Sequence, residues 1–222
     1  MQLRKNLVLF VLFATTSLFA QRARAEDLNG VLTKLDAAAR NFRSTSAQVE
    51  ADTIQKDPIP NTDVMLGMAY YERTGNQFQM AAHFTEFNKQ PTGKTYIFSG
   101  GVFRLSETGK EKDAKPYPQA SKYESYLMLG FGASGHDLQE KWNITYQGTE
   151  IIDGVTTAKL ELVAKDPEVR KNLQKVTAWM DTARAVSLKQ IFDEGGGNSY
   201  QCLYTNIKMN QSLPKNAFAF SK

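Results

Sequence analysis

The sequence predicts a mainly β chain, in which roughly eleven short strands form one curved or nearly closed antiparallel sheet that packs with helices. Three observations lead to this fold class. Many short apolar segments are separated by turn signals such as Asp153-Gly154, apolar residues from Leu28 to Phe42 recur at helical spacing, and the segment Val64–Tyr71 is apolar at every position but Gly67. Neither an internal repeat nor a shift in composition marks a second domain.

The segment Val64–Phe84 is the most informative part of the chain. It reads as two strands joined by a tight turn at residues 74–76, and the first strand is apolar on both faces until Glu72. A half-exposed strand alternates apolar with polar residues, so both faces of this one need cover. A sandwich core and an apolar cavity both satisfy that requirement. Met68 and Met80 favour the cavity slightly, because methionine fits irregular apolar surfaces.

Capping and turn signals define the other elements. Asp27 is the expected N-cap of the first helix, and Asp166-Pro167 begins a short helix that runs to about residue 174. Two more short helices are expected at 121–129 and 136–142, with the glycine-rich segment 130–135 between them. Residues 107–118 read as an exposed loop or a weak edge strand. The remaining strands are expected at 46–56, 95–99, 102–106, 143–150, 155–165, 176–181, 187–193, 199–209 and 217–220.

Residues 1–25 have the layout of a secretory signal peptide, with Arg4 and Lys5 before an apolar run and Ala23-Arg24-Ala25 as a cleavage site. A retained membrane anchor is the alternative. Cleavage leaves residues 26–222 as one exported domain and removes four of the 27 basic residues, which leaves 23 basic against 23 acidic residues. A mature chain without net positive charge does not fit nucleic-acid binding.

The residue types that carry chemistry do not gather into a motif. His83 and His136 have no partner at metal-ligand spacing, and residues 132–135 do not match the G-x-S-x-G elbow of hydrolases. Cys202 is the one cysteine, which rules out an internal disulfide, and we expect a buried, unreactive thiol. We therefore expect no catalytic residue, metal or cofactor; an esterase acting on envelope lipids is the enzymatic alternative.

The order of elements resembles the LolA family of periplasmic carriers of outer-membrane lipoproteins. The resemblance covers essentially all of residues 26–222 and is a diffuse pattern rather than one diagnostic string. It is carried by the helix 28–42, the strand pair 66–84 with Tyr70-Tyr71-Glu72-Arg73, the hairpin at 96–101, the segments 126–132 and 138–146, Leu160-Glu161-Leu162, Asp166-Pro167-Glu168-Val169, Trp179-Met180-Asp181 and residues 206–210.

The resemblance implies an unclosed, strongly curved antiparallel barrel with a helical lid over an apolar cavity. It further implies a monomeric periplasmic protein that takes lipoprotein acyl chains from an inner-membrane ABC transporter and passes them to an outer-membrane receptor. Arg73 matches the family's gating arginine at the end of the second strand, where it holds the lid; Thr74 stands where the family usually has proline.

Several apolar residues are candidates for the cavity wall, and each also fits a packed core. The alternative function is a periplasmic module of the same fold that binds or senses another lipid, or regulates an envelope stress protease, without handling lipoproteins. The sequence ends at Lys222, shortly after Phe218-Ala219-Phe220, which leaves a contact with the membrane open. The cavity candidates are Met68, Tyr70, Phe78, Met80 and Phe98 in strands and Leu32, Leu35, Leu127 and Leu129 in helices.

Overall fold

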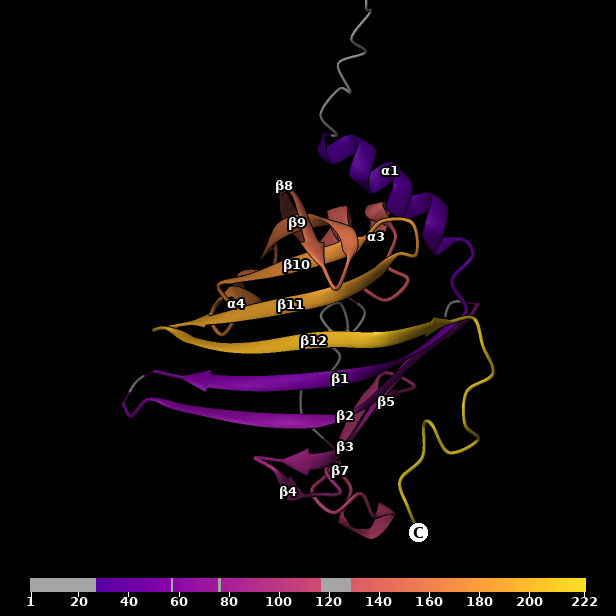
Figure 1. The fold of residues 1–222 in the computed structure, drawn as a ribbon, viewed down its shortest axis with the longest axis vertical. Helices are drawn as coiled ribbons and strands as arrows, with labels where there is room; N and C mark the ends of the chain where they lie inside the picture. Colours follow the sequence, from indigo (N-terminus) through magenta and orange to yellow (C-terminus); the bar gives the residue numbers. More distant parts are fainter. Residues whose placement is uncertain (1–26, 57, 76, 117–128) are drawn as a thin grey trace, which may run out of the picture.

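A computed structural model describes residues 27–56, 58–75, 77–116 and 129–222. Its centre is one antiparallel sheet of twelve strands that curls into an unclosed barrel (Figure 1). The strands of the first half are β1 (Ser44–Gln55), β2 (Asn61–Thr74), β3 (Gln77–Phe87), β4 (Gln90–Pro91), β5 (Thr95–Ser99), β6 (Val102–Ser106) and β7 (Lys115–Pro116). Those of the second half are β8 (Trp142–Ile152), β9 (Val155–Ala164), β10 (Lys175–Asp181), β11 (Val186–Gly195) and β12 (Asn198–Met209).

The strand order explains both the curl and the opening. Along the sheet the order is β7-β6-β5-β3-β2-β1-β12-β11-β10-β9-β8, with β4 beside β3. The first long strand, β1, pairs with the last, β12, so two meanders are joined into one sheet. Within the described residues β7 and β8 do not pair with each other, and the barrel stays open as expected.

Helices fill one half of the inner face, which is the face of the sheet that carries the two large buried clusters. Helix α1 (Leu28–Ala39) begins at Asp27, whose side chain accepts a hydrogen bond from Gly30 N at 2.9 Å. Helix α3 (Gly135–Lys141) begins with a capping box between Ser134 and Asp137. Both pack on β8–β10 in one buried cluster, whose members include Val31, Leu35, Leu138, Trp142, Leu160, Val176 and Met180.

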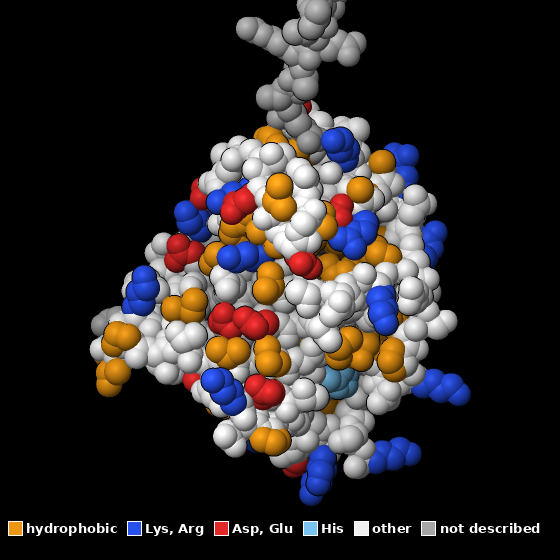
Figure 2. Space-filling view, in the orientation of Figure 1, with side chains coloured by type: hydrophobic (Ala, Val, Ile, Leu, Met, Phe, Trp, Pro, Cys, Tyr) orange, Lys and Arg blue, Asp and Glu red, His pale blue; other side chains and the backbone are white. Residues whose placement is uncertain are grey.

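The opposite, outer face is covered in part by the C-terminal segment. Phe220 and Phe218 pack with Ala81 and Ile97 of β3 and β5, and Ala217 O lies 2.7 Å from His83 Nε2. The strand expected at 217–220 is therefore wrong, since these residues pair with no strand and only Ser221 forms an isolated bridge. Elsewhere on the face seen in Figure 1, hydrophobic side chains lie in small groups among charged ones (Figure 2).

Most other differences from the expected elements concern where they end. Helix α1 ends at Ala39 instead of near residue 43, and α4 (Pro167–Arg170) stops short of residue 174. The expected loop 107–118 contains a 3-10 turn, Glu111–Asp113, and the edge strand β7. The helix expected at 121–129 lies almost wholly outside the described residues. Among the described residues, no helix combines the length and the apolar character needed to cross a membrane.

Candidate functional site

A row of small side chains on the inner face leaves space in the half of the barrel away from α1. Ala47, Ala69 and Ala82 are direct cross-strand partners on β1, β2 and β3, and Tyr96 of β5 extends the row. Methyl groups at three adjacent positions cannot reach across the interior. The curved sheet therefore encloses a hollow at this level, bounded by the larger side chains of the neighbouring rows.

Gly67 lies two residues before Ala69 on the same face of β2 and affects the curvature of the sheet around the hollow. The register of β2 against β3 shifts between Leu66 and Gly67, which marks a β-bulge. A Cβ at Gly67 would lie 2.2 Å from the carbonyl oxygen of His83, so no larger residue fits this close approach. A bulge bends its strand and increases the local twist, which curves the wall around the hollow.

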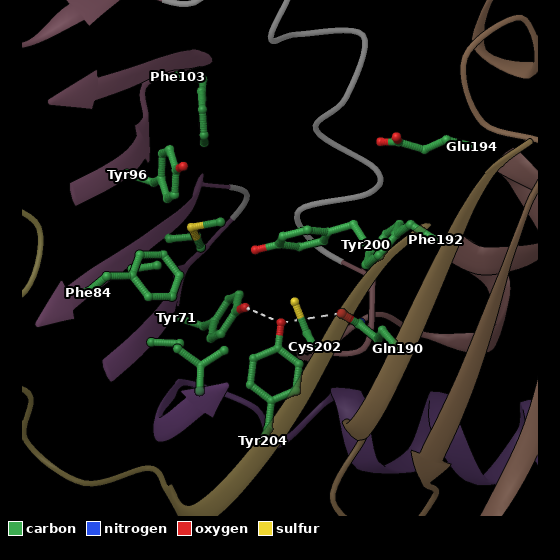
Figure 3. Close-up of a pocket in the computed structure, with 14 residues that line it drawn as sticks. Tyr71, Phe84, Tyr96, Phe103, Gln190, Phe192, Glu194, Tyr200, Cys202 and Tyr204 are labelled. Atoms are coloured by element: carbon green, nitrogen blue, oxygen red, sulfur yellow. Dashed lines mark hydrogen bonds between the residues drawn. The ribbon is translucent and has the colours of Figure 1, made fainter. Parts of the chain in front are cut away.

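The hollow is a cavity of about 440 Å³, within the range of about 300–1,000 Å³ typical of ligand pockets. Aromatic residues of β3, β5 and β6 face those of β11 and β12 across it (Figure 3). Its lining consists of Val49, Ala69, Tyr71, Met80, Ala82, Phe84, Tyr96, Phe103, Gln190, Phe192, Glu194, Tyr200, Cys202 and Tyr204.

A short chain of polar side chains lies in the wall of this cavity. The hydroxyl oxygens of Tyr71 and Tyr204 are 3.3 Å apart, and Tyr204 donates to Gln190 Oε1 at 3.3 Å (Figure 3). Gln190 Nε2 donates in turn to the carbonyl oxygen of Leu129. Burial raises the pKa of Tyr71 and of Tyr204 well above the usual range, so both phenols are neutral at neutral pH.

Cys202 points into the cavity beside this chain (Figure 3). Burial raises the pKa of its thiol to about 11, so at neutral pH the thiol is protonated and a poor nucleophile. Among the described residues that line the cavity, the exposed Glu194 is the one with a charged side chain. The interior thus offers an apolar, aromatic surface with a few neutral hydrogen-bonding groups, which is an environment for hydrocarbon and not for ions.

An aromatic wall closes one end of the cavity. The Phe131 ring stacks on Tyr71 at 3.7 Å between centroids and meets Tyr204 edge-on at 4.8 Å. Two backbone hydrogen bonds hold the segment around Phe131 in place. They run from Ser187 N to Gly130 O at 2.6 Å and from Gly132 N to Ala185 O at 2.8 Å.

The strand residues expected at the cavity divide between the two faces of the sheet. Met80 lines the cavity, and Phe78 and Phe98 pack in the buried cluster around it. Met68 and Tyr70 lie on the outer face of β2, where Tyr70 contacts the ring of His83. The cavity therefore does not include them, which corrects the sequence-based expectation. Alternate residues of a strand point to opposite faces, and β2 presents Ala69 and Tyr71 inward instead.

The helical candidates lie elsewhere. Leu32, Leu35 and Leu129 are buried in the cluster beneath α1 and α3, in the half of the barrel that side chains fill. Leu127 lies outside the described residues. These leucines take part in holding the helices on the sheet, and their expected role as cavity residues remains a prediction.

Arg73 lies at the end of β2, below the C-terminal end of α1. Its backbone N donates to Arg43 O at 2.8 Å, and its side chain borders a second hollow that Arg40 and Phe42 also line. Arg73 thus lies between the end of the helix and the sheet. Its gating role remains a prediction.

Sequence reasoning missed most of the aromatic lining. The available signal was the other parity of β2, since Met65, Gly67, Ala69 and Tyr71 share the face opposite to Met68. Within the described residues no group of three or more His, Cys, Asp or Glu side chains is placed to hold a metal ion. The lining residues that sequence reasoning did not propose include Tyr71, Tyr96, Phe103, Gln190, Phe192, Tyr200 and Tyr204.

Comparison with known proteins identifies relatives of the fold only. No protein-family model matches the sequence, and no curated protein matches it significantly. Among solved structures, MucB matches with a TM-score of 0.50 and 10% identity over 86% of this chain and 62% of MucB. A putative outer membrane lipoprotein-sorting protein domain from Vibrio parahaemolyticus matches with a TM-score of 0.46 and 16% identity over 86% of this chain and 95% of that domain.

A LolA superfamily protein from Nitrosomonas europaea matches with a TM-score of 0.41 and 16% identity over 88% of this chain and 98% of that protein. The match to MucB, at 10% identity and a TM-score of 0.50, shows a likeness of fold alone. The fold that this chain shares with MucB is a strongly curved and unclosed antiparallel sheet with helices on its inner face.

Proposed function

We propose that this protein binds the acyl chains of a lipid or lipoprotein in the cavity between β1–β3 and β11–β12. The observation that carries the proposal is the cavity of about 440 Å³, whose described lining is aromatic and apolar and carries only neutral groups besides Glu194. Burial of an acyl chain there contributes about 0.8 kcal/mol per methylene. Binding of this kind requires no catalytic residue, so the proposed activity is carriage and not an enzymatic reaction.

The finer proposal is that the protein carries lipoproteins through the periplasm, from an inner-membrane ABC transporter to an outer-membrane receptor. It draws its support from the LolA-like order of elements and from the signal-like residues 1–25. An open barrel suits such a role, because its two halves can separate to admit and release an acyl chain without breaking a closed ring of hydrogen bonds.

The test is uptake of a fluorescent fatty-acid probe by the protein and by an Ala82→Phe variant. Ala82 is the β3 member of the small-residue row and lines the cavity, so a phenyl group there occupies space that the ligand needs. We expect affinity to fall at least about tenfold, since the displacement of two methylenes removes about 1.6 kcal/mol.

The matched control is Thr85→Phe, at an exposed position of the same strand. It adds the same ring to β3 without entering the cavity, and its affinity for the probe should equal that of the unchanged protein. If Ala82→Phe folds and takes up the probe as well as Thr85→Phe does, the proposed site is not where the acyl chain binds.

A further inference from the structure

A second hollow, of about 570 Å³, lies where the C-terminal end of α1 meets the turn between β2 and β3. Three arginines line it. Arg40 is the C-cap of α1, and Arg43 lies between α1 and β1. Arg73 is the residue before Thr74, the last residue of β2. We call this hollow the arginine notch. It shares no described lining residue with the apolar cavity.

Two of the three arginines are cross-strand neighbours. Ser44 pairs with Glu72, and Arg73 N donates to Arg43 O at 2.8 Å, so the pairing of β1 with β2 continues by one residue on each side. By strand alternation Arg73 shares the inward face with Tyr71. Like charges at directly opposed positions are destabilising unless an opposite charge lies between them.

The protein supplies little opposite charge at the notch. Arg43 donates through one Nη to the carbonyl oxygens of Arg40 and Phe42, at 3.0 and 2.9 Å, which fixes its guanidinium and leaves its other N–H donors unused by described residues. In the described part of the chain, no acidic side chain forms an ion pair with any of the three arginines.

The two nearest carboxylates in the sequence are engaged elsewhere. Glu72 also borders the notch, but Glu72 Oε2 accepts a hydrogen bond from Gln79 Nε2 at 2.6 Å, on the adjacent strand β3. Asp36, one helical turn before Arg40, accepts from His136 N at 3.1 Å. The described lining of the notch therefore holds three arginines against one carboxylate, an excess of two positive charges.

We propose that the arginine notch binds a phosphate-type oxyanion. Guanidinium groups match the oxygens of phosphate in paired hydrogen bonds, and a partly preorganised set of three binds such a group better than isolated surface charges do. The anion comes either from a phospholipid headgroup at a membrane surface or from free phosphate. This inference does not rest on the acyl-binding function, because the notch and the cavity are separate sites.

The experiment compares Arg40→Gln/Arg73→Gln with a control, Lys112→Gln/Lys215→Gln, which removes two charges from exposed positions outside the notch. Binding to vesicles of phosphatidylglycerol mixed with phosphatidylcholine is measured by flotation, and binding of inorganic phosphate by calorimetry. A basic residue at an anionic surface contributes roughly a factor of five, so we expect vesicle affinity to fall about 25-fold in the notch variant and far less in the control.

The two measurements separate the sources of the anion. Vesicle binding without phosphate binding identifies the membrane headgroup, and phosphate binding that the notch variant loses identifies the free ion. Equal losses in both variants, or no binding by the unchanged protein in either assay, overturn the proposal. The charge-preserving variant Arg40→Lys/Arg73→Lys should bind vesicles better than the Gln variant, because it keeps the charge, and less well than the unchanged protein, because it loses the paired donors. Thermal unfolding of both variants detects a general loss of folding.

Discussion

Arg73 is the residue on which the proposed transfer step depends most. It joins the end of β2 to the chain that leaves α1, through the hydrogen bond between its backbone N and Arg43 O. If its side chain controls how α1 sits on the sheet, Arg73→Leu should still load cargo but fail to release it to an acceptor.

The measurement is a two-step assay that scores loading and transfer separately. Arg73→Lys serves as the control, because it keeps the positive charge but loses the planar fork of donors. Unchanged loading and transfer in Arg73→Leu would contradict the gating role.

Cys202 gives a prediction for stability against pH. Its pKa in the folded protein is raised to about 11, from 9.0, by burial, so the native state holds the thiol proton more tightly than the unfolded chain does. The resulting contribution to stability is complete below about pH 9 and is lost as the pH rises towards 11.

Urea unfolding at about pH 8 and about pH 10.5 measures this effect. The unchanged protein should lose more stability between the two pH values than Cys202→Ala does, although the buried tyrosines contribute to the loss in both. An equal loss in the two proteins would mean that the thiol is not buried as described.

At the residue scale, the sequence identified the right strand but not its inward face. Both faces of β2 carry apolar side chains, so alternation alone does not distinguish Met68 from Ala69. The distinction depends on the pairing of Ala69 with Ala47 and Ala82, which are distant in sequence and meet only in the folded sheet. A single alanine in a strand does not indicate a cavity. The cavity forms because three alanines from different strands lie side by side in the folded sheet.

At the scale of elements, the segment Gly130–Gly132 places the ring of Phe131 against Tyr71, which lines the cavity. Gly132 has a φ of +73°, and a Cβ there would lie 2.4 Å from the ring of Phe42. Gly132→Ala should lower the free energy of unfolding by about 1–3 kcal/mol, because it adds a clash in a packed core to the strain of a left-handed conformation.

Gly148→Ala separates the two causes. Gly148 has a φ of +94° with open space around its Cβ position, so the substitution brings backbone strain without a clash. Urea unfolding of both variants should show the larger loss for Gly132→Ala. A loss no greater than that of Gly148→Ala would show that Phe42 does not pack against this segment.

Elements with local signals were predictable, and those that depend on distant contacts were not. The N-caps Asp27 and Asp166 and the turn at Asp153-Gly154 occur where the sequence indicates, because capping and turn geometry involve residues a few positions apart. Phe218 and Phe220 resemble a strand in spacing, yet they pack on the outer side of β3 and β5. Their partners, Ala81 and Ile97, lie more than a hundred residues away.

At the scale of the whole molecule, the barrel has two halves with different interiors. Beneath α1 and α3 the interior is filled by side chains, whereas between β1–β3 and β11–β12 it is open. The sequence predicted a curved antiparallel sheet because strand follows strand with short turns. It did not predict that β1 pairs with β12, which brings Val49 opposite Tyr204 and so builds the wall of the cavity from both ends of the chain.

We propose that the open half of the barrel holds an acyl chain. Native mass spectrometry of the purified protein, followed by denaturing lipid extraction, tests it most directly. We expect one bound acyl-bearing molecule per protein, with lower occupancy in Ala82→Phe and unchanged occupancy in Thr85→Phe. A mass without ligand that stays unchanged on titration with fatty acid would contradict it.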